Sequence, residues 1–344
     1  MKICIYTDNH YAQYSSILRN RGSKYSVRLE NQIESLNWVE ELSAQKKCDR
    51  VVCLGDFFDK PELNAEELTA LKSIKWNKDA THIFLVGNHE MGSNDLEYSS
   101  SHVFESLGFQ SIKYVDYEKI GNAGIIYLPY LLKDRRATLK QYKEDLTYDN
   151  QAEKYIVFSH NDIAGIRYGQ YLSKDGFDIQ DIYDNCDLFI NGHLHNQTQI
   201  NDKTINLGNL TGQNFSEDAT KYSHCAAILD TETLELELIN NPYAFDFFKF
   251  DIDTQEQLDA NLALCKGYSV VTVKVPDTML VETRQKLIEK SNIVQFRVIT
   301  KVTKDTKVNS MEELVKVDHI QQFKDYCVQH IDNTEVLIDE LSKL

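Results

Sequence analysis

Short apolar runs separated by longer mixed segments recur along the first 230 residues. The runs are rich in Ile, Val, Leu or Tyr, and most of them end in a polar residue. Runs of this length and composition predict buried β-strands. Eight of them cover residues 2–8, 50–56, 82–88, 124–130, 154–160, 188–193, 204–209 and 225–230.

Between the first two runs, the segment 31–45 carries apolar residues on one helical face. Ile33, Leu36, Val39 and Leu42 recur at three-residue spacing, which predicts an amphipathic helix. Strands that alternate with helices favour an α/β fold in which helices cover the faces of layered sheets.

A second unit is expected to start near Pro242. Its alternating strand and helix patterns predict a small α/β domain over residues 242–306, after a first domain over residues 1–241. The predicted strands cover residues 247–251, 268–275 and 294–302, and the predicted helices cover residues 255–265 and 278–291.

The remaining residues, 307–344, are predicted to form short helices. Ser310 and Glu313 fit a capping box at the start of the first one. Helices this short need a surface to cover, and that surface is either the second domain of the protein itself or a partner protein. The apolar stripes consist of Ile320, Phe323, Cys327 and Ile331, followed by Leu337, Leu341 and Leu344.

The net charge of the chain limits which binding partners are expected. The 344 residues carry a formal net charge of −16, which argues against broad electrostatic attraction to nucleic acid or to an anionic membrane. A nucleic-acid substrate is still compatible with this charge, because two divalent metal ions and a local basic loop can offset the field at one site.

Three features favour a cytoplasmic protein without a membrane segment. No stretch approaches the roughly 20 apolar residues of a membrane-spanning helix. The first residues lack the apolar core of a signal peptide. The seven cysteines include no CxxC pair and fit reduced thiols better than disulfides.

Five short polar blocks stand at the ends of predicted strands. Taken singly, each block is weak, since a lone histidine at a strand end more often makes an ordinary hydrogen bond. Together they supply carboxylate, amide and imidazole ligands for a divalent cation, at the strand ends where α/β sheets bind ligands. The blocks are Asp8-Asn9-His10, Gly55-Asp56, Gly87-Asn88-His89-Glu90, Ser159-His160 and Gly192-His193-Leu194-His195.

The order of these blocks, D-x-H, G-D, G-N-H-E, H and G-H-x-H, resembles the calcineurin-like metallophosphoesterases over residues 1 to about 215. The resemblance implies a layered metallophosphoesterase β-sandwich flanked by helices, with two divalent metal ions at the strand ends. Asp56 would bridge the two ions. By the same resemblance, one ion would be held by Asp8, His10 and His195, and the other by Asn88, His160 and His193.

The resemblance also implies a chemistry. Manganese is the expected metal, with magnesium as the alternative, because magnesium prefers oxygen ligands to imidazole. The two ions would lower the pKa of a bridging water. His89 would face the phosphate and donate a proton or stabilise its charge. Asp59 and Glu90 would orient metal ligands from behind, although Glu90 could equally be a solvated loop carboxylate.

Within that superfamily the chain resembles the SbcD-type double-strand-break repair nucleases, in particular the small subunit of phage recombination endonucleases. The resemblance rests on the small α/β domain after the core, the terminal amphipathic helices, the opening K-I-C-I-Y-T-D-N-H and the block V-C-L-G-D-F-F-D. It implies a DNA exonuclease, endonuclease or both, acting with an SMC-like SbcC-type ATPase. Residues 242–306 would then cap the DNA, residues 307–344 would dock on the ATPase, and the protein would form a homodimer.

A basic loop after the first strand favours a polymer substrate. Arg19, Arg21, Lys24 and Arg28 fall within ten residues of an otherwise acidic chain, and we expect them to contact the DNA backbone near the metals. The alternative is a solvated connector.

Two other functions stay open. A stand-alone phosphatase or phosphodiesterase would use the same metal core, but it would not need the residues after Pro242 or the basic loop. A non-catalytic scaffold would keep the fold, but it would not need His89 or the full set of ligands.

Overall fold

The computed structural model describes residues 1–13, 21–93, 95–168 and 171–301, which lie within one compact unit, Met1–Lys301. The helices predicted for residues 307–344 lie outside the described residues, as does Arg19. In the described part, no helix is both long enough and apolar enough to cross a membrane.

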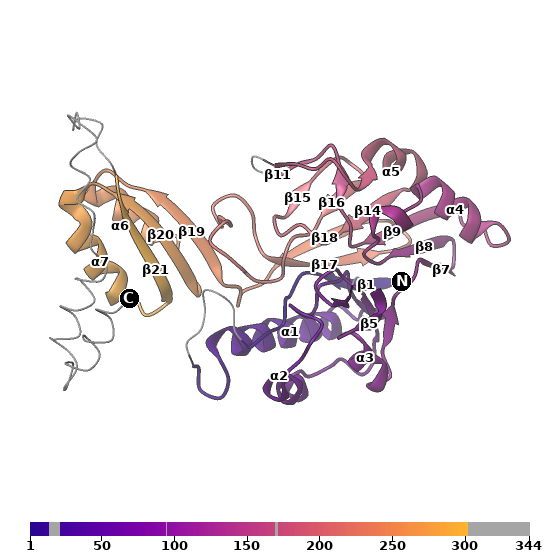
Figure 1. Ribbon diagram of the computed structural model, residues 1–344, viewed down its shortest axis with the longest axis horizontal. Helices are drawn as coiled ribbons and strands as arrows, with labels where there is room; N and C mark the ends of the chain where they lie inside the picture. The colour runs from indigo at the N-terminus through magenta and orange to yellow at the C-terminus, as the bar shows by residue number, and fades with distance from the viewer. Residues whose placement is uncertain (14–20, 94, 169–170, 302–344) are drawn as a thin grey trace, which may run out of the picture. The chain divides into compact units, whose positions relative to one another are not determined.

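Two six-stranded sheets form the centre of the fold (Figure 1). The first has the order β18-β17-β1-β2-β3-β6, and β1, β2, β3 and β6 run parallel. Strands β17 and β18 continue it in antiparallel fashion. The bounds are β1 (Lys2–Tyr6), β2 (Arg50–Cys53), β3 (Thr81–Leu85), β6 (Gln110–Ile112), β17 (Cys225–Asp230) and β18 (Leu236–Asn240).

The second sheet has the order β15-β16-β14-β9-β8-β7, and its four middle strands run parallel. All eight predicted strands are confirmed, since each apolar run overlaps a strand of one of the two sheets. The bounds are β7 (Asp116–Ile120), β8 (Ala123–Leu128), β9 (Lys154–Ser159), β14 (Leu188–Asn191), β15 (Thr198–Gln199) and β16 (Thr204–Asn206).

The two sheets pack face to face, because alternate residues of their strands point into one shared apolar cluster. Ile3 and Ile83 of the first sheet meet Ile125, Ile156 and Ile190 of the second, all essentially without solvent exposure. Outward-facing residues of the central strands are covered by helices, so the predicted layered α/β fold is confirmed.

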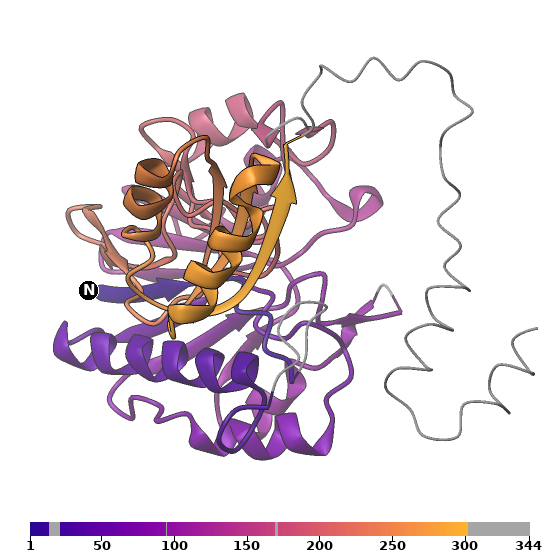
Figure 2. The same ribbon diagram turned by 90° about the vertical axis from the view of Figure 1, so that its left-hand side faces the viewer.

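Helix α1 (Val27–Gln45) covers the outer face of the first sheet (Figure 1, Figure 2). It starts four residues before the predicted helix, because the Ser26 hydroxyl accepts a hydrogen bond from Leu29 N and caps it. Helices α2 (Ala65–Ala70) and α3 (His102–Ser106) lie on the same side, and α4 (Leu139–Thr147) and α5 (Ile179–Asn185) cover the second sheet.

Shorter elements complete this part of the chain. Two-residue strands pair as β10 (Ile163–Ala164) with β13 (Phe177–Asp178), and β11 (Arg167–Tyr168) with β12 (Tyr171–Leu172). Strand β4 (Met91–Gly92) pairs with β5 (Asp95–Ser99), directly after the predicted ligand loop at Asn88. The six cysteines in the described part are free and buried.

A third sheet follows, with its own apolar cluster. It contains three parallel strands, β19 (Asp246–Asp251), β20 (Ser269–Val275) and β21 (Ile293–Thr300). Helices α6 (Gln255–Leu262) and α7 (Leu280–Glu289) connect them as the sequence predicts. Because residues 1–301 form one compact unit, a domain boundary at residue 242 stays a prediction.

Candidate metal centre

The predicted ligands follow strands of both sheets. Because neighbouring parallel strands end at one edge, side chains just beyond those ends converge. Asp8 and His10 follow β1, and Asp56 follows β2; Asn88 follows β3. From the second sheet, His160 follows β9, and His193 and His195 follow β14.

The backbone at this edge is strained. Asp8, His10, Asp56 and His193 have φ values of 50°, 47°, 47° and 76°, in the left-handed region that residues with a Cβ avoid. Each such conformation costs on the order of 1–3 kcal/mol and persists where the surroundings enforce it. These four residues are all predicted ligands, so the strain falls at the proposed site.

One group of ligands consists of Asp8, His10 and His195. Nε2 of His10 lies 3.8 Å from Asp8 Oδ1 and 3.1 Å from Nε2 of His195. Asp8 Oδ2 accepts hydrogen bonds from Thr7 Oγ1 at 2.6 Å and from His193 N at 2.9 Å. Asp8 Oδ1 is buried without a hydrogen-bond partner, which leaves it for a cation.

The other group consists of Asp56, His160 and His193, to which Asn88 adds its Oδ1 at 3.0 Å from His193 Nδ1. Asp56 Oδ2 lies 3.1 Å from His160 Nε2 and 3.9 Å from His10 Nε2. Asp56 therefore faces both groups, which is the position expected of a bridging ligand.

The electrostatics of the site favour positive charge. Burial alone would lower the pKa of His160, but the Asp56 and Asp8 carboxylates raise it to about 9. Burial would likewise raise the pKa of Asp56, yet His160 and His10 hold it well below its usual value. A site that stabilises a buried imidazolium in this way also suits divalent cations.

These residues fit two divalent metal ions. The donor set is carboxylate oxygen, amide oxygen and imidazole nitrogen, without thiolate. Asp8 offers an unpartnered buried oxygen, and His10 and His195 direct ring nitrogens toward each other. The identity of the metal stays a prediction.

His89 lies beside the ligands, and 42% of its side chain is exposed. Its ring meets the His10 ring edge-on, with a centroid separation of 4.5 Å. Nδ1 of His89 lies 3.0 Å from the backbone oxygen of Asp59. Because a carbonyl only accepts, Nδ1 carries the hydrogen, and Nε2 is the nitrogen left for a substrate.

The carboxylate of Asp59 contacts a predicted metal ligand, and that of Glu90 binds the backbone beside the ligand loops. Asp59 Oδ1 lies 3.1 Å from Nδ1 of His10, opposite the nitrogen that faces the other ligands. Glu90 is fully buried and accepts hydrogen bonds from Phe58 N at 3.1 Å and Gly87 N at 2.7 Å. Burial and the nearby Asp56 raise the pKa of Glu90 to about 7. The interpretation of Glu90 as a solvated loop carboxylate is therefore wrong.

Two further carboxylates were missed in the sequence. Asp162 Oδ1 lies 3.5 Å from Nε2 of His193, and Glu217 Oε1 lies 3.8 Å from Nδ1 of His195. A carboxylate behind an imidazole fixes its orientation toward a metal. Asp162 stands two residues after the predicted ligand His160, which is a usable signal. Glu217 lies 22 residues beyond His195, in a loop that no motif singles out.

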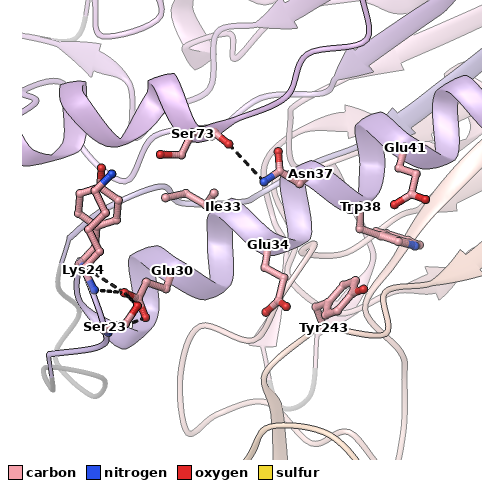
Figure 3. Close-up of a pocket in the computed structure, with 11 residues that line it drawn as sticks. Ser23, Lys24, Glu30, Ile33, Glu34, Asn37, Trp38, Glu41, Ser73 and Tyr243 are labelled. Atoms are coloured by element: carbon pink, nitrogen blue, oxygen red, sulfur yellow. Dashed lines mark hydrogen bonds between the residues drawn. The ribbon is translucent and has the colours of Figure 1, made fainter.

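The described part of the predicted basic loop lies among acidic side chains. Arg21 forms an ion pair with Glu66 at 2.6 Å. The Glu30 carboxylate accepts hydrogen bonds from the backbone of Ser23, Lys24 and Tyr25 (Figure 3). The groove beside Lys24 is lined by Glu30, Glu34 and Glu41, which would repel a phosphate backbone.

Arg28 is buried and does not lie on the surface, where a DNA contact would require it. It is only 2% exposed, and Nη2 donates to the backbone oxygen of His10 at 3.0 Å. A buried guanidinium cannot meet a DNA phosphate, so the structure does not support the expected DNA contact of Arg28.

Comparison with solved structures finds phosphoesterases at low sequence identity. A dimetal phosphatase from Danio rerio shares 14% identity, with 70% of this chain and 98% of that chain covered and a TM-score of 0.41. A phosphoesterase from E. coli shares 12%, with coverages of 70% and 100% and a TM-score of 0.31. A calcineurin-like phosphoesterase from Bacillus subtilis shares 13%, with coverages of 70% and 88% and a TM-score of 0.34.

A search of curated proteins finds no match. The family model of the calcineurin-like phosphoesterases matches residues 1–197. That stretch is more than half of the chain and contains all seven predicted metal ligands. The chain therefore belongs to the calcineurin-like phosphoesterase family.

Proposed function

We propose that this protein is a two-metal phosphodiesterase that cleaves DNA, as the nuclease subunit of a repair and recombination complex with an SMC-like ATPase. The observation that carries the hydrolytic part is the pair of ligand groups that Asp56 faces, with His89 exposed beside them. The DNA substrate and the ATPase rest on the resemblance of the sequence to the SbcD-type nucleases.

The arrangement suits hydrolysis of a phosphoester. Two divalent cations bound here would neutralise phosphate charge and supply a water of lowered pKa. The protein itself adds His89. Since Nδ1 of His89 keeps its hydrogen on the Asp59 carbonyl, His89 would give a proton to the leaving oxygen from Nε2, as an imidazolium that becomes the neutral ring. Asp59 thereby holds both His10 and His89 in place.

The exposure of the site is compatible with a large substrate. The side chains of His89 and His195 are 42% and 29% exposed, so a phosphate within a polymer can reach them. The exposed ligands belong to both groups, since His193 is also partly exposed. We infer that the scissile phosphate lies over these three histidines.

A second candidate is a phosphatase or phosphodiesterase for small substrates. The observation that favours it is the state of the basic loop, in which Arg21 is paired with Glu66 and Arg28 is buried. A small ester needs the metal ions but no extended basic surface.

Digestion assays separate the two candidates. End-labelled duplex and single-stranded DNA are incubated with the protein and Mn²⁺, with bis-p-nitrophenyl phosphate and p-nitrophenyl phosphate in parallel. Cleavage of both DNA and the diester, if a chelator abolishes it, supports the proposal of a nuclease. Hydrolysis of the monoester with intact DNA would establish the phosphatase instead.

The protein is expected to bind two divalent ions and to be more active with Mn²⁺ than with Mg²⁺. Imidazole nitrogens form much of the donor set, and Mg²⁺ prefers oxygen ligands and retained water. Metal analysis after saturation with Mn²⁺ and gel filtration measures the stoichiometry. One ion or none on folded protein would contradict the two-metal assignment.

The segment from Ser310 onward is proposed to bind the ATPase and to be dispensable for metal chemistry. A chain that ends at Lys307 should then stay folded, bind two metal ions and cleave bis-p-nitrophenyl phosphate, while losing the ATPase in a pull-down. An insoluble product would mean that the segment covers the protein's own core. Full retention of the ATPase would remove the segment from the interface.

A further inference from the structure

We propose that Arg28, Gln32 and Gln213 form a buried polar clamp that sets the metal affinity of the group Asp8, His10 and His195. These three clamp residues touch the backbone of the loop Asp8-Asn9-His10 rather than a metal. The inference rests on the metal site of the proposed function but is independent of the substrate.

The clamp supplies the hydrogen-bond donors that the loop carbonyls need. Gln213 Nε2 donates to Thr211 O at 3.1 Å and to Asn9 O at 3.2 Å, and Asp8 O lies 3.4 Å from the same nitrogen. Gln32 Nε2 donates to Asn9 O at 2.8 Å and to His10 O at 2.6 Å. Arg28 Nη2 adds a bond to His10 O at 3.0 Å. The carbonyls of Asn9 and His10 are therefore held by side chains.

The orientation of Gln213 is fixed by its partners. Its Oε1 accepts from Arg28 Nη2, and its amide nitrogen faces only carbonyl oxygens. An arginine only donates and a carbonyl only accepts, so the amide cannot be turned round without losing both contacts. Arg28 thus acts on the loop twice, directly and through Gln213.

The buried setting makes these bonds costly to lose. Arg28 is 2% exposed, Gln32 is fully buried and Gln213 is 8% exposed. A buried carbonyl left without its donor loses the hydrogen bond that offset its removal from water. Losing a clamp donor would therefore favour a shift of the loop that satisfies its carbonyls elsewhere.

The loop is also the place where the backbone is under strain. Asp8 and His10 both have positive φ, and such residues persist only when their surroundings enforce the conformation. The amide side is held by the main chain, since Asp8 N and His10 N donate to Gly55 O and Asp56 O at 3.1 and 2.9 Å. The clamp holds the backbone carbonyls of the same loop. Together, these two sets of hydrogen bonds fix the direction of the Asp8 and His10 side chains.

The effect should fall on one ion only. Asp8 and His10 belong to one ligand group, whereas Asn88, His160 and His193 come from other loops. None of the clamp bonds above reaches those loops. Losing the clamp should therefore weaken one of two binding constants and leave the other.

The test measures Mn²⁺ binding by titration calorimetry and by the electron paramagnetic resonance signal of free Mn²⁺. Gln213→Ala should weaken one of two binding constants by about 10–100-fold, the usual loss for an outer partner of a metal ligand. The second constant should stay within about twofold of the unchanged protein. Gln32→Ala should weaken the same binding constant, so that the result does not depend on a single variant.

Two backgrounds identify the affected ion. With His160→Ala the remaining ion is the one held by Asp8, His10 and His195, and Gln213→Ala should weaken it. With His195→Ala the remaining ion belongs to the other group, and Gln213→Ala should leave it unchanged. The opposite pattern, or equal weakening in both backgrounds, would overturn the clamp.

Asn241→Ala is the matched control. Asn241 is also a buried amide, but its Nδ2 donates to Ser35 Oγ and Leu210 O rather than to a carbonyl of Asp8, Asn9 or His10. It should leave both binding constants unchanged, and an equal loss there would show a general packing effect and overturn the proposal. Fewer than two Mn²⁺ on the unchanged protein would instead refute the proposed two-metal function.

Discussion

Replacing Asp56 with asparagine is expected to weaken the binding of both metal ions and to abolish hydrolysis at micromolar Mn²⁺. Asp56 is buried, and its Oδ2 lies 3.1 Å from Nε2 of His160 and 3.9 Å from Nε2 of His10. Its charge therefore serves both ligand groups. Loss of an outer partner costs roughly 10–100-fold in metal affinity, so loss of a shared ligand should exceed about 100-fold for each ion.

The substitution should leave the fold largely intact. Oδ1 of Asp56 accepts a hydrogen bond from His89 N at 2.9 Å, and an asparagine oxygen can accept the same bond. Metal content after dialysis against Mn²⁺ and hydrolysis of bis-p-nitrophenyl phosphate are the two measurements. A variant that keeps two tightly bound ions would remove Asp56 from the bridging position.

Asp187→Asn provides the control for the loss of one carboxylate. Oδ2 of Asp187 accepts from Tyr155 N at 2.7 Å, near the start of β9, whereas His160 follows the end of that strand. Its replacement should change neither metal content nor activity. Equal losses in both variants would point to net charge rather than to the bridging position.

The central strands could be predicted because they are buried on both faces. The five residues of β1, Lys-Ile-Cys-Ile-Tyr, are apolar after the first, and four of them are fully buried. Edge strands give no such signal. In β18 all five side chains are partly or largely exposed, and its pairing depends on β17, which lies beside it only in the folded chain.

The ligands could be predicted for a related reason. Parallel strands deliver the residues that follow them to one edge, so the sequence position of Asp56 or His160 already fixes its place in the sheet. The residues that support the ligands carry no such marker. Glu217 reaches His195 from a distant loop, and that contact exists only once the chain has folded.

Arg28 shows why residue type alone misleads. An arginine near a predicted phosphate site suggests a phosphate contact, and only the packing of α1 against the metal loop shows that its side chain points inward. Gln32 follows it by about one helical turn and reaches the same loop. Polar residues on the buried face of α1 indicate such inward contacts, because polar side chains are rarely buried without a hydrogen-bond partner.

His89→Ala is expected to keep both metal ions and to lower the rate of hydrolysis by about 10²–10⁴-fold, the usual contribution of a positioned acid or base. His89 follows the ligand Asn88, but its Nδ1 is bonded to the carbonyl of Asp59 and its side chain is 42% exposed. Its removal takes away a proton donor for the leaving oxygen. It leaves in place the hydrogen bond from His89 N to Asp56, because the backbone supplies it.

The comparison with His160→Ala separates chemistry from metal binding. His160 is fully buried beside Asp56, so its loss should lower metal content first and activity as a consequence. For His89→Ala, the rate should fall at full metal occupancy, and excess Mn²⁺ should not restore it.

The dependence of the rate on the leaving group adds a further readout. If His89 protonates the leaving oxygen, a diester with p-nitrophenolate as leaving group should lose less activity than DNA, since a good leaving group needs less help from an acid. Equal metal loss in the two variants would make His89 a metal ligand rather than a proton donor.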